Sequence, residues 1–92
     1  MQSVIVHPRV SVRHQDISCD DVLAAWDTCL RSGLRGNRTP DEQIAIGLDE
    51  AGRLIEMVAV RLEFDSWLIY HAMTPPSRKT LEELGLYGER GK

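Results

Sequence analysis

One histidine stands where this sequence is best suited to do chemistry. His71 lies near the end of the apolar run from Trp67 to Met73, and an imidazole can accept or donate a proton near neutral pH. Cleavage of RNA without a metal ion needs a base for the 2′-hydroxyl proton, a cation for the charge that builds on phosphate, and an acid for the leaving oxygen. His71 is therefore the candidate acid or base.

Cationic side chains that could hold a phosphate are spread along the chain. Arg61 and Arg78 are the candidate catalytic cations, because a planar guanidinium can make two parallel contacts to phosphate oxygens. The further candidates for substrate binding are Arg53, Lys79, Arg13, His14, Arg35 and Arg38. The sequence does not show whether these groups converge in space.

Each candidate also has a purely structural explanation. His71 could be a histidine at the rim of a sheet, and His14 could end a helix, where an imidazolium interacts favourably with the helix dipole. Arg53, directly after Gly52, has the position of a solvated turn residue. Arg35 and Arg38 could belong to a solvated loop.

Two charged residues interrupt the apolar run from Leu54 to Leu62. Arg61 must reach solvent or pair with a carboxylate such as Glu63 or Asp65, because an unpaired buried charge is costly. Glu56 raises the same question, and an arrangement of Glu56 with Arg61 could be structural or part of a site.

Length and charge limit the classes of function. We expect residues 1–92 to form one small domain, with residues 87–92 as a frayed tail. The net charge is -3, and residues 41–73 carry seven carboxylates against two arginines. This acidic middle argues against a broad nucleic-acid-binding face, which would be rich in lysine and arginine. A small basic site near the two ends is compatible with it.

The sequence predicts a cytoplasmic protein without a cofactor. No apolar run reaches the roughly 20 residues that span a bilayer, and the N-terminus lacks the pattern of a signal peptide. Cys19 and Cys29 are too far apart on one predicted helix to form a disulfide, so both are expected to be reduced thiols in the core. No cluster of histidines, cysteines and carboxylates has the spacing of metal ligands, so no metal site is expected.

Two helices are predicted before the acidic middle. Residues 8–14 are expected to be helical, although the alternating valines nearby would also fit a strand. Ser18 is a favourable N-cap for the second helix, and Asp20 and Asp21 fall in its first turn, where carboxylates complement the helix dipole.

The second helix is expected to continue to about Leu30. Its apolar residues recur at helical spacing through Trp26, which we expect in the core, and Gly33 has the position of a residue just past the end. Residues 32–41 are then expected to form a polar connecting loop.

Three strands and a short helix are predicted after this loop. The strands are expected over residues 44–48, 54–62 and 67–73, joined by the turns Glu50-Ala51-Gly52 and Asp65-Ser66. The middle strand is apolar on both faces, which predicts a central position in the sheet. Ser77 is expected to cap a helix that Gly85 ends. Together these elements predict an α+β fold: N-terminal helices, a three-stranded or four-stranded antiparallel meander sheet, and a short C-terminal helix.

A resemblance to a known family is carried by the segment AIGLDEAGRLIEMVAVR, by WLIYHAM after it, and by the predicted helix that follows the prolines. This part of the chain resembles the BrnT-type toxins of bacterial type II toxin–antitoxin systems, which belong to the RelE/ParE-like group of small ribonuclease toxins. The resemblance covers roughly residues 9–84. Arg13-His14 resemble the basic–His pair that ends an early helix in that family, and Gly52-Arg53 resemble its strand opener. His71-Ala72-Met73 stands where the family has a small residue, alanine and arginine, so Met73 replaces the arginine.

The resemblance implies metal-independent RNA cleavage and neutralisation by a cognate antitoxin protein. The alternative is a catalytically inactive module of the same fold that binds a partner protein, which the acidic residues 41–73 and Met73 favour. A homodimer is compatible with both hypotheses, and neither involves a membrane. A basic cleft around His71 would favour the ribonuclease, whereas an acidic or apolar patch would favour the binding module.

Overall fold

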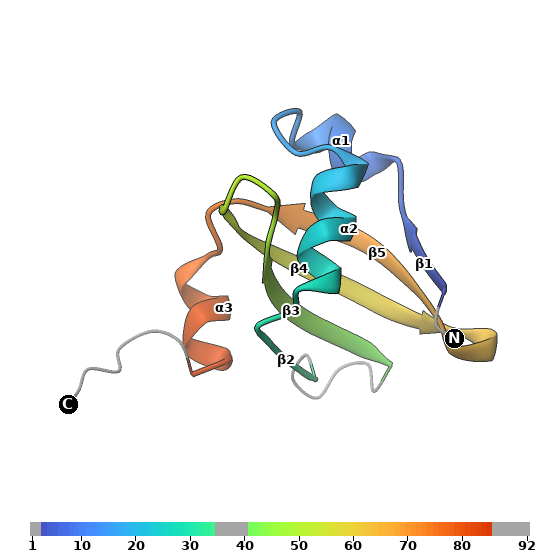
Figure 1. Ribbon diagram of the computed structural model, residues 1–92. Helices are drawn as coiled ribbons and strands as arrows, with labels where there is room; N and C mark the ends of the chain where they lie inside the picture. The colour runs from blue at the N-terminus through green and yellow to red at the C-terminus, as the bar shows by residue number, and fades with distance from the viewer. Residues whose placement is uncertain (1–2, 35–40, 86–92) are drawn as a thin grey trace.

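The computed structural model describes residues 3–34 and 41–85 as a mixed five-stranded sheet with three helices (Figure 1). The strands follow the spatial order β1-β5-β4-β3-β2. The strands are β1 (Ser3–Val6), β2 (Arg31–Leu34), β3 (Glu42–Leu48), β4 (Leu54–Leu62) and β5 (Ser66–Met73), and the helices are α1 (Arg9–Arg13), α2 (Cys19–Asp27) and α3 (Arg78–Glu83). None of the helices in these two ranges is long and apolar enough to cross a membrane.

The three predicted strands are confirmed as the centre of the sheet. β3, β4 and β5 form an antiparallel meander with β4 in the middle. Gly52 in the first turn has a φ of 85°, the left-handed conformation that its hairpin loop requires. β4 is central because its side chains are buried on both faces, as its two-sided apolar pattern predicted.

The sheet is larger than predicted, and it is not purely antiparallel. β1 pairs in parallel with the first half of β5, from Ser3 opposite Ser66 to Val6 opposite Ile69. Val4 and Val6 face inward while Ser3 and Ile5 face outward, which is the alternation of a half-buried strand. Four residues are too short a pattern to separate a strand from a loop, and each residue of β1 pairs with one 63 positions further along the chain.

The predicted end of the second helix was wrong. α2 ends at Asp27, and Arg31–Leu34 form the edge strand β2 on β3 instead of continuing a helix and a loop. Thr28 explains the turn, because its hydroxyl donates to the Leu48 carbonyl and accepts from the Leu48 N–H, at 2.8 and 3.1 Å. These bonds bring the chain onto the sheet edge, where the N–H of Leu30 donates to Ile46.

The prediction that both cysteines are core thiols was also wrong. Cys19 is the first residue of α2 and is exposed, and Cys29 follows the helix and is exposed. The helical stripe that placed them inside ends before Cys29. The side chains that α2 does bury are those of Val22 and Ala25.

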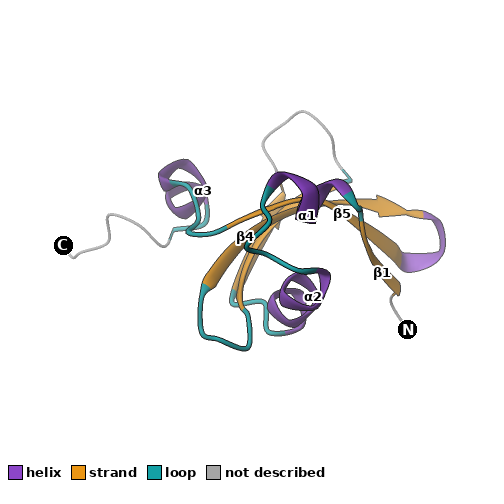
Figure 2. Ribbon diagram, turned by 90° about the horizontal axis from the view of Figure 1, so that it is seen from above, coloured by secondary structure: helices purple, strands orange, loops and turns teal. Residues whose placement is uncertain are grey.

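The main core lies between α2 and the sheet. Gly47 of β3 lies directly beneath Ala25 of α2, where a side chain would overlap the helix backbone. Trp67 is buried here, and Trp26 packs against it at 5.8 Å between ring centroids, which agrees with the expected place of Trp26 in the core. Figure 2 shows α2 and α3 on opposite sides of the sheet, so β4 is covered on both faces. The core residues are Val10, Ile17, Val22, Ala25, Ala45, Ile55, Met57, Ala59, Trp67, Ile69 and Ala72.

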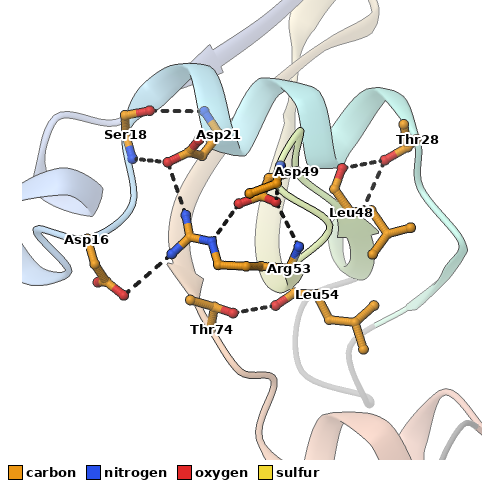
Figure 3. Close-up of polar contacts among 10 residues, drawn as sticks. Asp16, Ser18, Asp21, Thr28, Leu48, Asp49, Arg53, Leu54 and Thr74 are labelled. Atoms are coloured by element: carbon orange, nitrogen blue, oxygen red, sulfur yellow. Dashed lines mark hydrogen bonds and ion pairs between the residues drawn. The ribbon is translucent and has the colours of Figure 1, made fainter.

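Arg53 joins three separate parts of this side of the molecule (Figure 3). Its Nε donates to Asp49 at 2.7 Å and one terminal nitrogen donates to Asp21 at 3.2 Å, while the other lies 3.7 Å from Asp16. Asp21 is also the second half of the capping box of α2, with Ser18. Arg53 therefore ties the β3–β4 hairpin to the start of α2.

The carboxylate of Asp49 depends on this arginine. Burial raises the pKa of Asp49, but hydrogen bonds from the backbone and side chain of Arg53 outweigh the effect and hold that pKa below its ordinary value. The hydrogen bond with Asp49 in turn raises the pKa of Arg53. The pair is ionised at neutral pH.

We expect Arg53→Met to lower the melting temperature by roughly 5–15 °C, because it leaves the buried Asp49 carboxylate without its main partner. The matched control is Arg78→Met, which removes an exposed ion pair within one turn of α3 and should change the melting temperature by about 2 °C or less. Thermal unfolding followed by circular dichroism measures both. Equal melting temperatures for the two variants would contradict the structural role of Arg53.

Candidate functional site

His71 lies at the junction of two hollows, which together we call the His71 cleft. The hollows have volumes of about 330 and 300 Å³ and share Arg9, Tyr70 and His71 as walls. The first continues along α3 and is also lined by Ile44, Glu56, Val58, Ser77, Lys79, Thr80 and Glu83. The second continues along α1 and is also lined by Val10, Arg13, His14 and Ala72.

A β-bulge on β5 turns Tyr70 and His71 toward the same cleft. Val58 of β4 pairs with His71, and the next residue, Ala59, pairs with Ile69, so Tyr70 is an extra residue on β5. In a regular strand these two neighbours would point to opposite faces. The pairing of β1 also ends at Ile69, and α1 packs against the remaining part of β5.

Glu56 fixes one side of the His71 ring. Nε2 of His71 lies 2.8 Å from one carboxylate oxygen of Glu56, and the other oxygen accepts from the N–H and hydroxyl of Ser77 at 2.9 and 3.0 Å. The Glu56 side chain is 7% exposed, whereas that of His71 is 33% exposed. The histidine therefore has one anchored nitrogen while part of its ring faces the cleft.

The carboxyl group of Glu56 is held in its ionised form. Burial raises its pKa, but hydrogen bonds from His71, Ser77 and Thr80 outweigh the burial and lower the pKa to about 2. The same carboxylate anchors the start of α3, because Ser77 is the N-cap of that helix. Glu56 is thus bound to both the candidate acid–base residue and the helix beside it.

Because of the Glu56 carboxylate, the free energy of unfolding should fall at acidic pH. Its pKa is about 2 in the folded protein against 4.5 ordinarily, so its contribution is fully present above pH 4.5 and is lost as the pH falls toward 2. We expect Glu56→Gln to lower the free energy of unfolding at pH 7 by about 3 kcal/mol or less, and this difference to shrink below about pH 4.5. Urea denaturation between pH 7 and pH 2.5 measures it. Glu83→Gln, an exposed carboxylate of the same cleft, is the control, and identical curves for the two variants would contradict the prediction.

His14 lines the second hollow together with His71. It follows the last residue of α1, and its ring centroid is 6.4 Å from that of His71, with the two ring planes perpendicular. Arg13 lines the same hollow. Of the residues that the sequence suggested, His71 thus shares the second hollow with His14 and Arg13 and the first with Lys79.

The His71 cleft is locally basic in an acidic protein. Its lining includes Arg9, Arg13 and Lys79 as well as the two histidines, against the carboxylates of Glu56 and Glu83. Glu56 is committed to its hydrogen bonds with His71 and Ser77. A positive local charge with two imidazoles is the composition that binds a phosphodiester and transfers protons to and from it.

Arg61 lies at another place in the fold. Its guanidinium stacks over Trp67 at 5.0 Å and lies 4.0 Å from Asp65, so it has the carboxylate partner that the sequence suggested. It lines a separate hollow with Trp26 and Gln43, and Glu56 pairs with His71 and not with Arg61. The geometry does not bring Arg61 to His71.

The remaining candidates do not line the cleft either. Arg78 projects from α3 with an exposed side chain and pairs with Glu82 at 3.3 Å. Arg53 comes directly before β4 and is held by its three carboxylates beside the start of α2. Arg35 and Arg38 lie outside the described residues, as does the tail over 87–92.

Two residues that line the cleft, Arg9 and Tyr70, were not predicted from the sequence. Arg9 is the first residue of α1, and the prediction of a helix over residues 8–14 would have placed it one turn from Arg13. Tyr70 carries no such signal, because only the bulge turns it toward His71. Its hydroxyl donates to Glu42.

Comparisons with protein-family models, with curated proteins and with solved structures found no significant match. The resemblance to BrnT-type toxins stays a prediction from the sequence, and the geometry of the His71 cleft carries the functional argument.

Proposed function

We propose that this chain is a toxin-like, metal-independent endoribonuclease that acts in the His71 cleft and that a cognate antitoxin protein neutralises. The observation that carries the proposal is the gathering of three cations and two histidines in one cleft of a protein whose net charge is -3. Cations are needed there to neutralise the phosphate, and imidazoles to move its protons.

The cleft supplies the parts of a transphosphorylation. His71 accepts the proton of the 2′-hydroxyl group, and the oxygen of that group attacks the adjacent phosphorus. Arg9 and Arg13 line the hollow that holds both histidines, and Lys79 lines the adjoining one; these cations balance the charge that builds on the non-bridging oxygens of the phosphate. Glu56 orients the His71 ring and stabilises the imidazolium that forms, as a carboxylate does for a catalytic histidine.

A second candidate function is a binding module of the same fold without activity. It is favoured by the positions of Arg61 and Arg78, the two expected catalytic cations, which do not line the His71 cleft. In this alternative the bond between Glu56 and His71 is structural and anchors α3 to the sheet. The acidic residues 41–73 would then contact a partner protein.

Cleavage of purified RNA in the presence of EDTA tests the proposal. We expect products with 2′,3′-cyclic phosphate and 5′-hydroxyl ends, because the 2′-hydroxyl is the nucleophile. An RNA with 2′-O-methyl groups should resist, which distinguishes this chemistry from hydrolysis by an attacking water. Intact RNA after incubation with the folded protein would contradict the ribonuclease proposal and favour the binding module.

A further inference from the structure

The two histidines of the cleft form a facing pair. His14 comes from the end of α1 and His71 from the bulge of β5, so two elements that pack on each other bring both rings into the lining of the second hollow. The ring centroids lie 6.4 Å apart with perpendicular ring planes, which is an edge-to-face arrangement. No hydrogen bond between the two rings is present.

Two imidazoles that line one hollow can serve a single phosphoryl group bound in it. In an in-line displacement the attacking and leaving oxygens lie on opposite sides of the phosphorus. A base and an acid must each come within hydrogen-bonding distance of one of these oxygens. Two imidazoles in the lining of one small hollow can meet that requirement, whereas one imidazole cannot be near both oxygens at the same moment.

We infer that His14 is the second proton-transfer residue of the cleft, the acid that protonates the leaving 5′-oxygen. The inference rests on the proposed ribonuclease function and assigns a role that a phosphate-binding histidine would not have. His71 takes the 2′-hydroxyl proton as the bond from O2′ to phosphorus forms. The bond from phosphorus to O5′ breaks, and O5′ takes a proton from the His14 imidazolium. The products are a cyclic phosphate and a 5′-hydroxyl, and exchange with solvent restores both rings.

The contact with Glu56 decides which histidine takes which role. The ionised Glu56 carboxylate can accept hydrogen bonds but cannot donate them, so Nε2 of His71 carries the hydrogen in this 2.8 Å bond. A neutral His71 then has its lone pair on Nδ1, which makes it the base. Within residues 3–34 and 41–85 the carboxylate contact of this kind belongs to His71 and not to His14, so His14 is left as the proton donor.

A single-atom change in the substrate isolates the acid. Replacing the 5′-bridging oxygen by sulfur at the cleaved linkage gives a thiolate leaving group, and thiols ionise at a pKa of about 8–9, so the thiolate departs without a proton. We expect His14→Ala to slow cleavage of ordinary RNA by roughly 10²–10⁴-fold and cleavage of the sulfur-substituted RNA by less than about 5-fold. His71→Ala should slow both substrates, because both need the 2′-hydroxyl proton removed.

Two matched variants separate chemistry from folding. His14→Phe keeps a ring against His71 but carries no proton, so it should behave as His14→Ala does. The control is His7→Ala. His7 lines neither hollow, and its Nδ1 accepts a hydrogen bond from the backbone N–H of Arg9 at 3.0 Å. The His7→Ala variant should therefore cleave both substrates at nearly the normal rate. Melting temperatures show that each variant is folded.

The outcomes distinguish this inference from the function on which it rests. If the natural chain cleaves neither substrate, the proposed function and the role of His14 both fail. If it cleaves both and the two His14 variants lose the two activities equally, His14 only binds phosphate or supports His71. Full activity of both His14 variants on ordinary RNA would also overturn the role of His14 while leaving the ribonuclease in place.

Discussion

His71→Gln should lower the rate of RNA cleavage by about 10²–10⁴-fold without unfolding the protein. Glutamine can place an amide N–H where Nε2 of His71 now contacts Glu56, so the anchor of α3 is retained. It cannot accept a proton near neutral pH, so the base for the 2′-hydroxyl is lost. Initial rates on a mapped RNA substrate in EDTA measure the effect, and circular dichroism shows that the fold is intact.

The control for this prediction is His7→Gln, the same substitution at a histidine that does not line the cleft. It should retain the normal rate. A His71→Gln variant that cleaves RNA as fast as the natural chain would remove His71 from the mechanism and would direct attention to Tyr70 and Lys79 on the same walls. Loss of activity together with loss of the folded signal would instead assign His71 to the support of α3.

Gly47→Ala should reduce the free energy of unfolding by at least about 3 kcal/mol, which is a large share of the total for a small domain. A Cβ on Gly47 would lie 2.6 Å from the carbonyl carbon of Ala25 and closer still to its oxygen. Both atoms belong to the backbone of α2, so no side chain can rotate away to make room. The whole helix must move off the sheet, which opens the core around Val22 and Ala25.

Urea denaturation of the natural and variant chains measures this cost. Gly33→Ala is the matched control, because its added Cβ would lie 3.3 Å from the end of the Leu84 side chain, which can shift. We expect Gly33→Ala to change the free energy of unfolding by about 1 kcal/mol or less. If Gly47→Ala unfolds at the same urea concentration as Gly33→Ala, then α2 does not rest on β3 as described.

Local sequence patterns predicted the central elements correctly. Ser18 and Ser77 are N-caps as expected, because a hydroxyl that accepts from a backbone N–H two or three residues ahead is a local interaction. The meander from β3 to β5 also follows from local patterns, since each strand pairs with its neighbour in sequence through a short turn. β1 and β2 were missed because four residues are too short to show a periodicity, and β1 in addition pairs with the distant strand β5.

The candidate site was predictable in part for the same reason. His71 stood out as an imidazole at the end of an apolar strand, and Arg13-His14 and Lys79 were named from sequence. The same reasoning named Arg53 and Arg61, which the fold uses elsewhere, because a guanidinium in a sequence carries no sign of which carboxylate or ring it will meet. Glu56 was recognised as a buried charge, but its partner depends on how β4 and β5 align.

The sequence by itself determined the residue types of the chemistry and the strand that carries His71, because both are properties of a few adjacent residues. Only the tertiary structure decided that His14 faces His71, that a bulge turns Tyr70 and His71 to one side, and that Glu56 holds the ring. Each of these depends on contacts between segments far apart in the chain. Such contacts are selected by the packing of the whole core and leave no periodic pattern in the residues that make them.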